Sequence, residues 1–280
     1  MSLYLNGVAL VTGAGSGIGR ECALGYAAEG ARGIVLADPD YDAAVDAAQE
    51  AETLATHPAF TAVAMRVDVT DLGSVAEMIR AVMKVFGRVD YYVHIATALN
   101  HSSVGGREEV ERENPDRAAQ MGANGAMQCV RAVSRVMKNQ SVGRYKSRGR
   151  IREGSRGTII TVASRNPTTT EHTQGATENP LLDLTRKAAL KNAAHGVRVN
   201  AICPGLVENA DPVSNGSIDP QKESIVPMSR TARPEEIADV ALFLSSPRAS
   251  YVTGATWTVD GGLALHAMQT QTANRAAVAI

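Results

Sequence analysis

One stretch near the start of the chain decides the fold: Thr12-Gly13-Ala14-Gly15-Ser16-Gly17-Ile18-Gly19. The apolar run before it, residues 8–11, is typical of a buried strand, and residues 20–30 after it indicate a helix that ends at a glycine. Glycines let the backbone turn tightly and approach an anion, and the N-terminus of the helix offers free N–H groups and a positive dipole end. The stretch therefore predicts a dinucleotide-binding loop more strongly than an ordinary tight turn.

Alternating strands and helices continue along the chain. Further strands are expected at residues 34–38, 62–69, 89–96, 158–162, 197–202 and 255–259. Helices are expected after Asp42 and at residues 72–86, 117–138, 180–194 and 235–244. This order predicts an α/β protein with a doubly wound, Rossmann-type parallel sheet, whose ligand lies at the carboxyl ends of the strands. We expect a single domain over residues 1–265, followed by a C-terminal tail at 266–280.

Composition excludes several classes of function. The chain has 280 residues and a net charge of −1, which gives no reason to expect a nucleic-acid or membrane partner. Residues 138–156 are rich in Arg and Lys, and we interpret them as a solvated, mobile surface loop. The three cysteines are too far apart to suggest a metal site or a disulfide framework. With neither a membrane-length apolar run nor a secretory signal, we expect a soluble cytoplasmic protein.

Asp38 ends the second strand, about twenty residues beyond the glycine loop. A carboxylate at this place can accept hydrogen bonds from both hydroxyls of an adenosine ribose, which favours NAD over NADP because its charge repels a 2′-phosphate. The alternative is that Asp38 caps the helix that follows. Arg20, or the residues flanking Asp38, would be the receptors of such a phosphate.

Several motifs in order resemble the short-chain dehydrogenase/reductase family over residues 5–265. They are residues 12–19, Asp68-Val69, residues 157–164, Arg198-Val199-Asn200-Ala201-Ile202-Cys203-Pro204-Gly205, residues 233–238, Val252-Thr253-Gly254 and Asp260-Gly261-Gly262. The resemblance implies a nicotinamide cofactor and a homotetramer. It also implies cofactor contacts from Gly13, Gly15, Ser16, Ile18, Gly19, Asp38, Asp68, Val69, Ala96, Thr97, Pro204, Gly205 and Val207.

The active site departs from the family pattern. That pattern has Asn, Ser, Tyr and Lys, and only Ser164 matches it, because Gly122, Gln174 and Glu178 stand at the other three positions. An amide cannot replace a phenol as an acid near neutral pH, and a Glu beside the ribose inverts the local charge. Two hypotheses follow. The chain is either a nucleotide-binding pseudoenzyme or an enzyme whose substrate needs no acid, such as an iminium ion.

The sequence also looks like the fungal bifunctional reductase/Diels–Alderases of prenylated indole alkaloid biosynthesis. This resemblance implies NADP(H), with NAD(H) as the alternative from Asp38. It implies reduction of a cyclic iminium derived from a prenylated Trp–Pro dipeptide, followed by an enantioselective intramolecular [4+2] cycloaddition in the same pocket. It further implies a carboxylate at position 166, where this chain has Asn166. Whether Asn166 is natural or an engineered Asp→Asn form stays open.

Three residues are the candidates for chemistry. Asn166 would hydrogen-bond an amide-rich substrate, or it is a turn residue before Pro167. Arg131 would hold the substrate carbonyl as a fixed cation, or it is a solvated helix residue. Ser164 retains a hydrogen-bonding role. The family usually has Asn-Asn-Ala-Gly after the fourth strand, and His94 takes the first position of this motif. We interpret His94 as a buried polar group whose hydrogen bonds are satisfied.

Overall fold

A computed structural model gives the fold and describes residues 3–96, 115–147, 149–163, 180–208, 224–267 and 269. Seven strands form one sheet in the order β3-β2-β1-β4-β7-β8-β9, and all neighbouring pairs are parallel. The strands are β1 (Val8–Thr12), β2 (Gly33–Asp38), β3 (Thr61–Arg66), β4 (Tyr91–Ala96), β7 (Gly157–Ala163), β8 (Val197–Pro204) and β9 (Thr256–Val259). The predicted doubly wound, Rossmann-type sheet in a single domain is confirmed.

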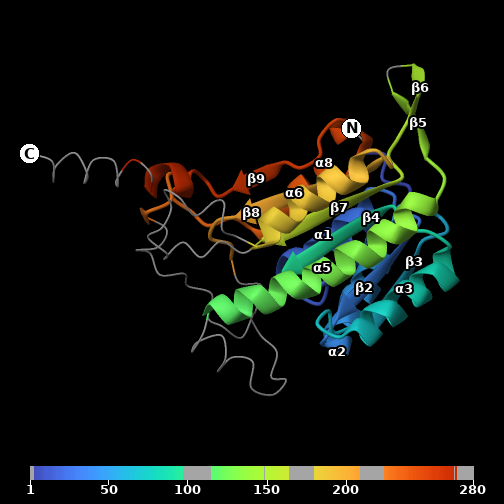
Figure 1. Ribbon diagram of the computed structural model, residues 1–280, viewed down its shortest axis with the longest axis horizontal. Coiled ribbons are helices and arrows are strands. Elements are labelled where there is room, and N and C mark those ends of the chain that lie inside the picture. Colours follow the sequence, from blue (N-terminus) through green and yellow to red (C-terminus); the bar gives the residue numbers. More distant parts are fainter. Residues whose placement is uncertain are drawn as a thin grey trace, which may run out of the picture.

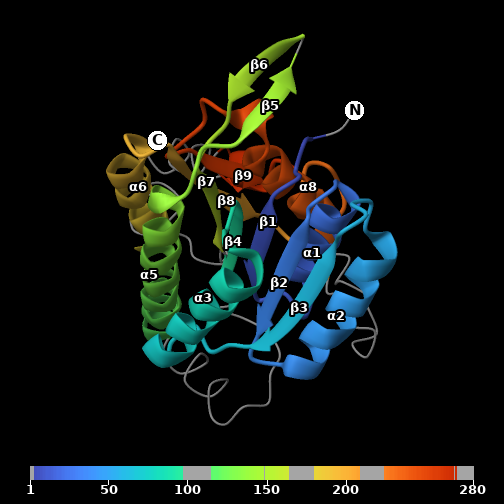
Figure 2. The ribbon, with the colours of Figure 1, turned by 90° about the vertical axis from the view of Figure 1, so that its right-hand side faces the viewer.

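Helices cover both faces of the sheet (Figures 1 and 2). One layer holds α1 (Gly17–Ala28), α2 (Tyr41–Leu54) and α8 (Pro234–Ser245), and the other holds α3 (Leu72–Phe86), α5 (Pro115–Asn139) and α6 (Pro180–Ala193). Strand β1 serves both layers, because Ala9 and Val11 pack into the first core and Leu10 into the second. Burial on both faces explains why the strands read as continuous apolar runs.

Local capping fixes the helix boundaries that the sequence predicts best. The carboxylate of Asp71 accepts hydrogen bonds from the N–H groups of Gly73 (3.0 Å) and Ser74 (3.1 Å) at the start of α3. The helix ends at Gly87, which has a φ of 73° in the left-handed region. The helix expected over residues 72–86 is therefore confirmed.

The third strand is shorter than predicted. It ends at Arg66, whereas the apolar pattern extends it to residue 69. The carboxylate of Asp68 turns the chain by accepting hydrogen bonds from the backbone N–H (2.9 Å) and the hydroxyl (2.7 Å) of Thr70. Local side-chain bonding of this kind competes with the β-ladder and ends the strand.

The prediction of a solvated surface loop at residues 138–156 is correct for solvent exposure, since residues 149–153 are all exposed, but wrong for the irregular loop. The chain forms an antiparallel hairpin from β5 (Arg144–Ser147) and β6 (Arg150–Glu153), with Gly149 in the left-handed region at the turn. The hairpin projects beyond the end of the sheet at which β1 begins (Figures 1 and 2). Charged side chains at most positions hide the period-two apolar pattern by which a strand is normally recognised.

Two negative expectations can be checked within the described residues. None of the helices described there has the length and hydropathy needed to cross a bilayer. The same residues bring together no group of three side chains suited to hold a metal ion. Cys22, Cys129 and Cys203 are buried free thiols. The domain boundary at residue 265 stays a prediction.

Candidate functional site

The glycine loop joins β1 to α1 through two residues with positive φ, Gly13 (75°) and Gly17 (49°). The loop starts by extending the sheet, because the N–H groups of Gly13 and Ala14 both donate to the carbonyl of Ala37 (2.9 and 3.3 Å). Gly19 allows the closest approach, since a Cβ atom there would lie 1.8 Å from the carbonyl oxygen of Gly13. The helix can pack onto the loop only because this position has no side chain.

The start of α1 fits the pyrophosphate of a dinucleotide. Ser16 is the N-cap, yet its side chain makes no capping hydrogen bond, and the first turn of the helix has no acidic residue. The N–H groups of the first three helical residues, Gly17 to Gly19, precede the first intrahelical hydrogen bond, and the dipole places a positive end there. A Cβ atom at Gly17 would meet no described atom within 4 Å. This cradle therefore leaves room for an anion on the helix axis.

Asp38 closes the loop on the side of β2. It is buried, and its two carboxylate oxygens accept hydrogen bonds from the N–H of Gly15 (2.9 Å) and the N–H of Asp40 (2.9 Å). Burial raises the pKa of this carboxyl. The alternative role of Asp38 as a helix cap is wrong, because Asp40 caps α2 through the N–H groups of Asp42 and Ala43. Asp38 thus holds the loop, and its contact with the ribose stays a prediction.

Arg20 is engaged elsewhere. Its guanidinium donates to the Glu50 carboxylate on α2, from Nε at 3.0 Å and from an Nη at 2.5 Å. This ion pair joins α1 to α2. It neutralises the charge of Arg20, one of the groups that we expected to bind a 2′-phosphate. NADP(H) binding through Arg20 would require the pair to open.

A buried polar network lies beneath the loop. The Thr12 hydroxyl is 2.9 Å from Nδ1 of His94 and 3.2 Å from the Tyr92 hydroxyl, which is itself 3.1 Å from the same Nδ1. His94 is 1% exposed, and burial lowers its pKa to about 4, so it is neutral at physiological pH. The interpretation of His94 as a satisfied buried group is confirmed. Tyr92 was missed, although its i, i+2 spacing to His94 places both side chains on one face of the strand.

The proposed adenine contacts also lie at the carboxyl edge. Asp68 and Val69 lie in the turn after β3, and α5 comes close to them, because a Cβ atom at Gly125 would lie 3.1 Å from the carbonyl oxygen of Val69. Glycine at this position therefore allows α5 to pack tightly against this turn.

The proposed nicotinamide contacts follow β8 at the same edge. Pro204 ends the strand, and the N–H of Gly205 donates to the carbonyl of Val259 at 2.9 Å. Val207 forms a parallel bridge with Ala232, which ties the chain after β8 to the start of α8. The structure thus places the glycine loop, Asp38, Asp68 and the turn after β8 along one edge of the sheet.

The candidate catalytic residues are placed less fully. Ser164, Asn166, Gln174 and Glu178 lie outside the described residues, as does Thr97, and Ala96 is the last residue of β4. Arg131 lies on α5 with its side chain exposed, whereas its neighbours Cys129 and Val133 face the core. The described residues do not bring Arg131 to the loop edge, so its catalytic role stays a prediction.

Comparison with known proteins decides the family. The family model described as enoyl-(acyl carrier protein) reductase matches residues 13–264. The chain belongs to the short-chain dehydrogenase/reductase family. This is a family of oxidoreductases whose fold binds NAD(P)(H), in agreement with the cradle described above.

Relatives of this family cover nearly the whole chain. The chain is 46% identical to the short-chain dehydrogenase anuF of Penicillium roqueforti, over 95% of this chain and 98% of that protein. It is 37% identical to the short-chain dehydrogenase fogB of Aspergillus ruber, over 94% and 99% respectively. Among solved structures, a short-chain type dehydrogenase/reductase from Mycobacterium ulcerans has a TM-score of 0.73 at 30% identity, over 92% and 90%.

The close approach at Gly19 predicts a selective loss on substitution. We expect Gly19→Ala to lower the free energy of unfolding by about 2–3 kcal/mol, because its Cβ would strike a backbone oxygen, and to weaken dinucleotide binding. Gly25→Ala on the same helix is the control, since its Cβ would meet the flexible tip of Leu242. Urea unfolding followed by the fluorescence of the single tryptophan, Trp257, measures both variants. Equal losses would contradict the loop geometry.

The buried His94 predicts a pH-dependent stability. Its pKa is about 4 in the folded protein and 6.5 in the unfolded chain, so the unfolded state binds the proton first as the pH falls. Between pH 7.5 and 5.5 this histidine should remove about 1.4 kcal/mol of stability. His94→Asn lacks the titrating group, and its free energy of unfolding should fall less over the same range. Parallel pH profiles for the two proteins would show that His94 titrates normally.

Proposed function

We propose that this chain uses NADPH to reduce a cyclic iminium derived from a prenylated Trp–Pro dipeptide. The same pocket then directs an intramolecular [4+2] cycloaddition of the resulting azadiene to a bicyclic indole alkaloid. One observation carries the proposal: the glycine loop and the start of α1 can hold a pyrophosphate, whereas Gln174 and Glu178 stand where the family has its Tyr and Lys. The cradle argues for hydride chemistry, and the missing pair argues against a carbonyl substrate.

The chemistry of the substrate explains why both observations fit together. NADPH supplies a hydride when bound. A reduced carbonyl leaves an alkoxide, which needs a proton from an acid such as the family's tyrosine. An iminium carbon is already electrophilic, and hydride addition neutralises the cation without a proton donor. A site without the acid is therefore suited to a preformed cation, and confinement then selects one folded conformer for cyclisation.

The chain's own groups take defined roles in this proposal. The first turn of α1 would hold the pyrophosphate, Asp38 the ribose, and the turn from Pro204 to Val207 the nicotinamide. Asn166 and Ser164 would hydrogen-bond the substrate amides, and Arg131 its carbonyl oxygen. A homotetramer is the assembly that we expect. The similarity to fungal short-chain dehydrogenases over nearly the whole chain supports an oxidoreductase.

NADPH is the cofactor in the proposal because the resembled alkaloid enzymes use it. Asp38 opposes this choice through its charge, and the pairing of Arg20 with Glu50 removes one counterion for a 2′-phosphate. NADH is therefore the alternative cofactor. A nucleotide-binding pseudoenzyme with a regulatory or partner-binding role is the alternative function, and the missing Tyr and Lys favour it equally.

The first experiment separates these functions. NADPH and NADH are titrated against the protein by fluorescence, and the protein is then incubated with the prenylated Trp–Pro iminium, followed by chiral analysis of the products. We expect cofactor consumption and one enantiomer of the bicyclic product. Binding without consumption, or a racemate equal to the enzyme-free control, would identify a pseudoenzyme.

The charge at position 38 predicts the cofactor preference. Asp38→Ser removes the carboxylate that faces a 2′-phosphate while keeping a hydroxyl for the ribose. We expect the ratio of the NADPH Kd to the NADH Kd to fall about tenfold, a change of roughly 1.4 kcal/mol. Asp42→Ser, an exposed residue in the first turn of α2, serves as the charge-matched control. An unchanged ratio in Asp38→Ser would remove Asp38 from the ribose site.

Asn166 predicts a gain of activity. A carboxylate there would stabilise the iminium and accept a proton, so Asn166→Asp should turn over faster, by about tenfold or more. Asn139→Asp introduces the same charge at the exposed C-terminal end of α5 and should leave the rate unchanged. Single-turnover kinetics with a saturating cofactor compares the three proteins. Equal rates would exclude Asn166 from the mechanism.

A further inference from the structure

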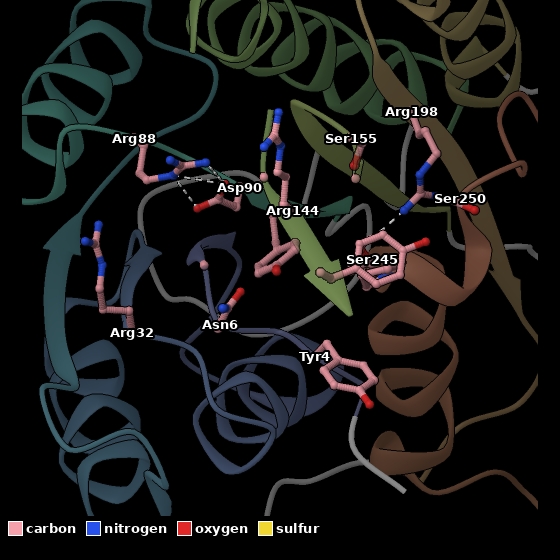
Figure 3. Close-up of a pocket in the computed structure, with 16 residues that line it drawn as sticks. Tyr4, Asn6, Arg32, Arg88, Asp90, Arg144, Ser155, Arg198, Ser245 and Ser250 are labelled. Atoms are coloured by element: carbon pink, nitrogen blue, oxygen red, sulfur yellow. Dashed lines mark hydrogen bonds and ion pairs between the residues drawn. The ribbon is translucent and has the colours of Figure 1, made fainter. Parts of the chain in front are cut away.

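A cavity of about 310 Å³ lies at the edge of the sheet opposite the glycine loop (Figure 3). It is formed where strands β1, β4 and β8 begin, and the base of the β5–β6 hairpin forms one of its walls. Its volume falls at the lower end of small-molecule sites, roughly 300–1,000 Å³. Ligands of doubly wound sheets bind at the carboxyl ends of the strands. This cavity is therefore separate from the dinucleotide site.

The lining of the cavity has a clear excess of positive charge. Four arginines line it, Arg32, Arg88, Arg144 and Arg198, against one acid, Asp90. Asp90 is already matched, because Arg88 donates to both of its carboxylate oxygens at 2.5–3.0 Å. Within the part of the chain that the structure describes, Arg144 has only a long, exposed ion pair with Glu153 at 3.9 Å, which contributes little. Three positive charges are left without a strong counterion among the lining residues.

Arg198 is the most unusual of these cations. It is 6% exposed, and its partners are neutral oxygens: the Thr158 hydroxyl (3.0 Å) and the carbonyls of Ser245, Ser246 and Val252 (3.2 Å each). Its Nε has no partner in the described residues. Burial lowers its pKa to about 10, so it stays charged at neutral pH. The carbonyls at the end of α8 offset part of this charge, but no carboxylate does.

Aromatic side chains supply the apolar part of the lining. Tyr4, Tyr91 and Tyr145 all border the cavity. The Tyr91 ring is fixed by stacking on Tyr26, with ring centroids 5.4 Å apart. Figure 3 shows Arg144 above Tyr4 on the hairpin side, with Arg198 directed toward Ser245. Cationic and aromatic groups around one space suit a ligand with an anionic head and an unsaturated body.

The hairpin wall is held in place rather than loosely attached. The side chain of Gln140 accepts from the N–H of Val89 (3.2 Å), donates to its carbonyl (2.7 Å) and also donates to the carbonyl of Arg156. At the base, the N–H of Gly154 donates to the carbonyl of Gly143 at 2.8 Å. The cavity is therefore largely preformed, which lowers the entropy cost of binding.

We propose that this cavity binds a small aromatic anion, a carboxylate or a phosphate ester, at a site distinct from the dinucleotide cradle. The anionic head would lie between Arg144 and Arg198, and the ring would pack on Tyr4 and Tyr145. This proposal does not depend on which reaction takes place at the dinucleotide site, at the carboxyl ends of the strands.

Calorimetric titration of the full chain with phenyl phosphate and benzoate, at saturating NADPH, tests the proposal. We expect saturable binding of at least one probe, and at least tenfold weaker binding in Arg144→Gln. Arg150→Gln is the matched control, because it removes the same charge from the same hairpin outside the cavity lining. Its affinity should stay within twofold of the unmodified chain. Tyr145→Leu should also weaken binding if the ring packs there.

Three results would overturn the site. One is the absence of saturable binding at millimolar concentrations of both probes. Another is an equal loss in Arg144→Gln and Arg150→Gln, which would indicate general attraction to a basic hairpin. The third is binding that occurs without NADPH and disappears with it, which would place the probe in the dinucleotide cradle. If inorganic phosphate bound with the same affinity as phenyl phosphate, the proposed packing of the ligand ring on the tyrosines would be wrong.

Discussion

The whole ligand-binding edge depends on the contact between Gly19 and the carbonyl of Gly13. Because a side chain at position 19 cannot fit, helix α1 lies directly on the loop and points its free N–H groups along the strand edge. Asp38 then fixes the loop from the neighbouring strand by accepting the N–H of Gly15. Beneath it, Thr12 is tied to Tyr92 and His94 on β4. One turn is thus anchored to three strands before any ligand arrives.

This anchoring has a chemical consequence. Near the loop, burial keeps His94 uncharged, Asp38 is an acid, and the Arg20 cation is paired with Glu50. Positive potential at the site comes mainly from backbone N–H groups rather than from side-chain cations. Hydride chemistry on a cationic substrate is compatible with such an environment, because the sequence has Glu178 where the family pattern has a lysine.

Much of the fold could be predicted, and the reasons differ by element. Strands buried on both faces are continuous apolar runs, and α3 has both a capping aspartate and a terminal glycine, so their limits follow from local chemistry. The predicted end of β3 was wrong because the Asp68 carboxylate accepts a hydrogen bond within the turn after the strand. Apolar periodicity does not reveal such a bond. The hairpin was missed because its charged residues carry no apolar alternation, and its anchor, Gln140, acts through residues distant in sequence. Within the site, the loop and Asp38 were predictable from spacing, whereas the Tyr92 network depends on how two parallel strands align.

The hairpin also has a consequence for how this fold diversifies. Its two ends meet, because Gly154 and Gly143 are joined by a backbone hydrogen bond at 2.8 Å. A segment whose ends adjoin can be lengthened, shortened or exchanged without moving the helix before it or the strand after it. The junction between α5 and β7 is therefore a natural insertion point, where new surface can be added while the carboxyl edge of the sheet on the far side keeps its geometry.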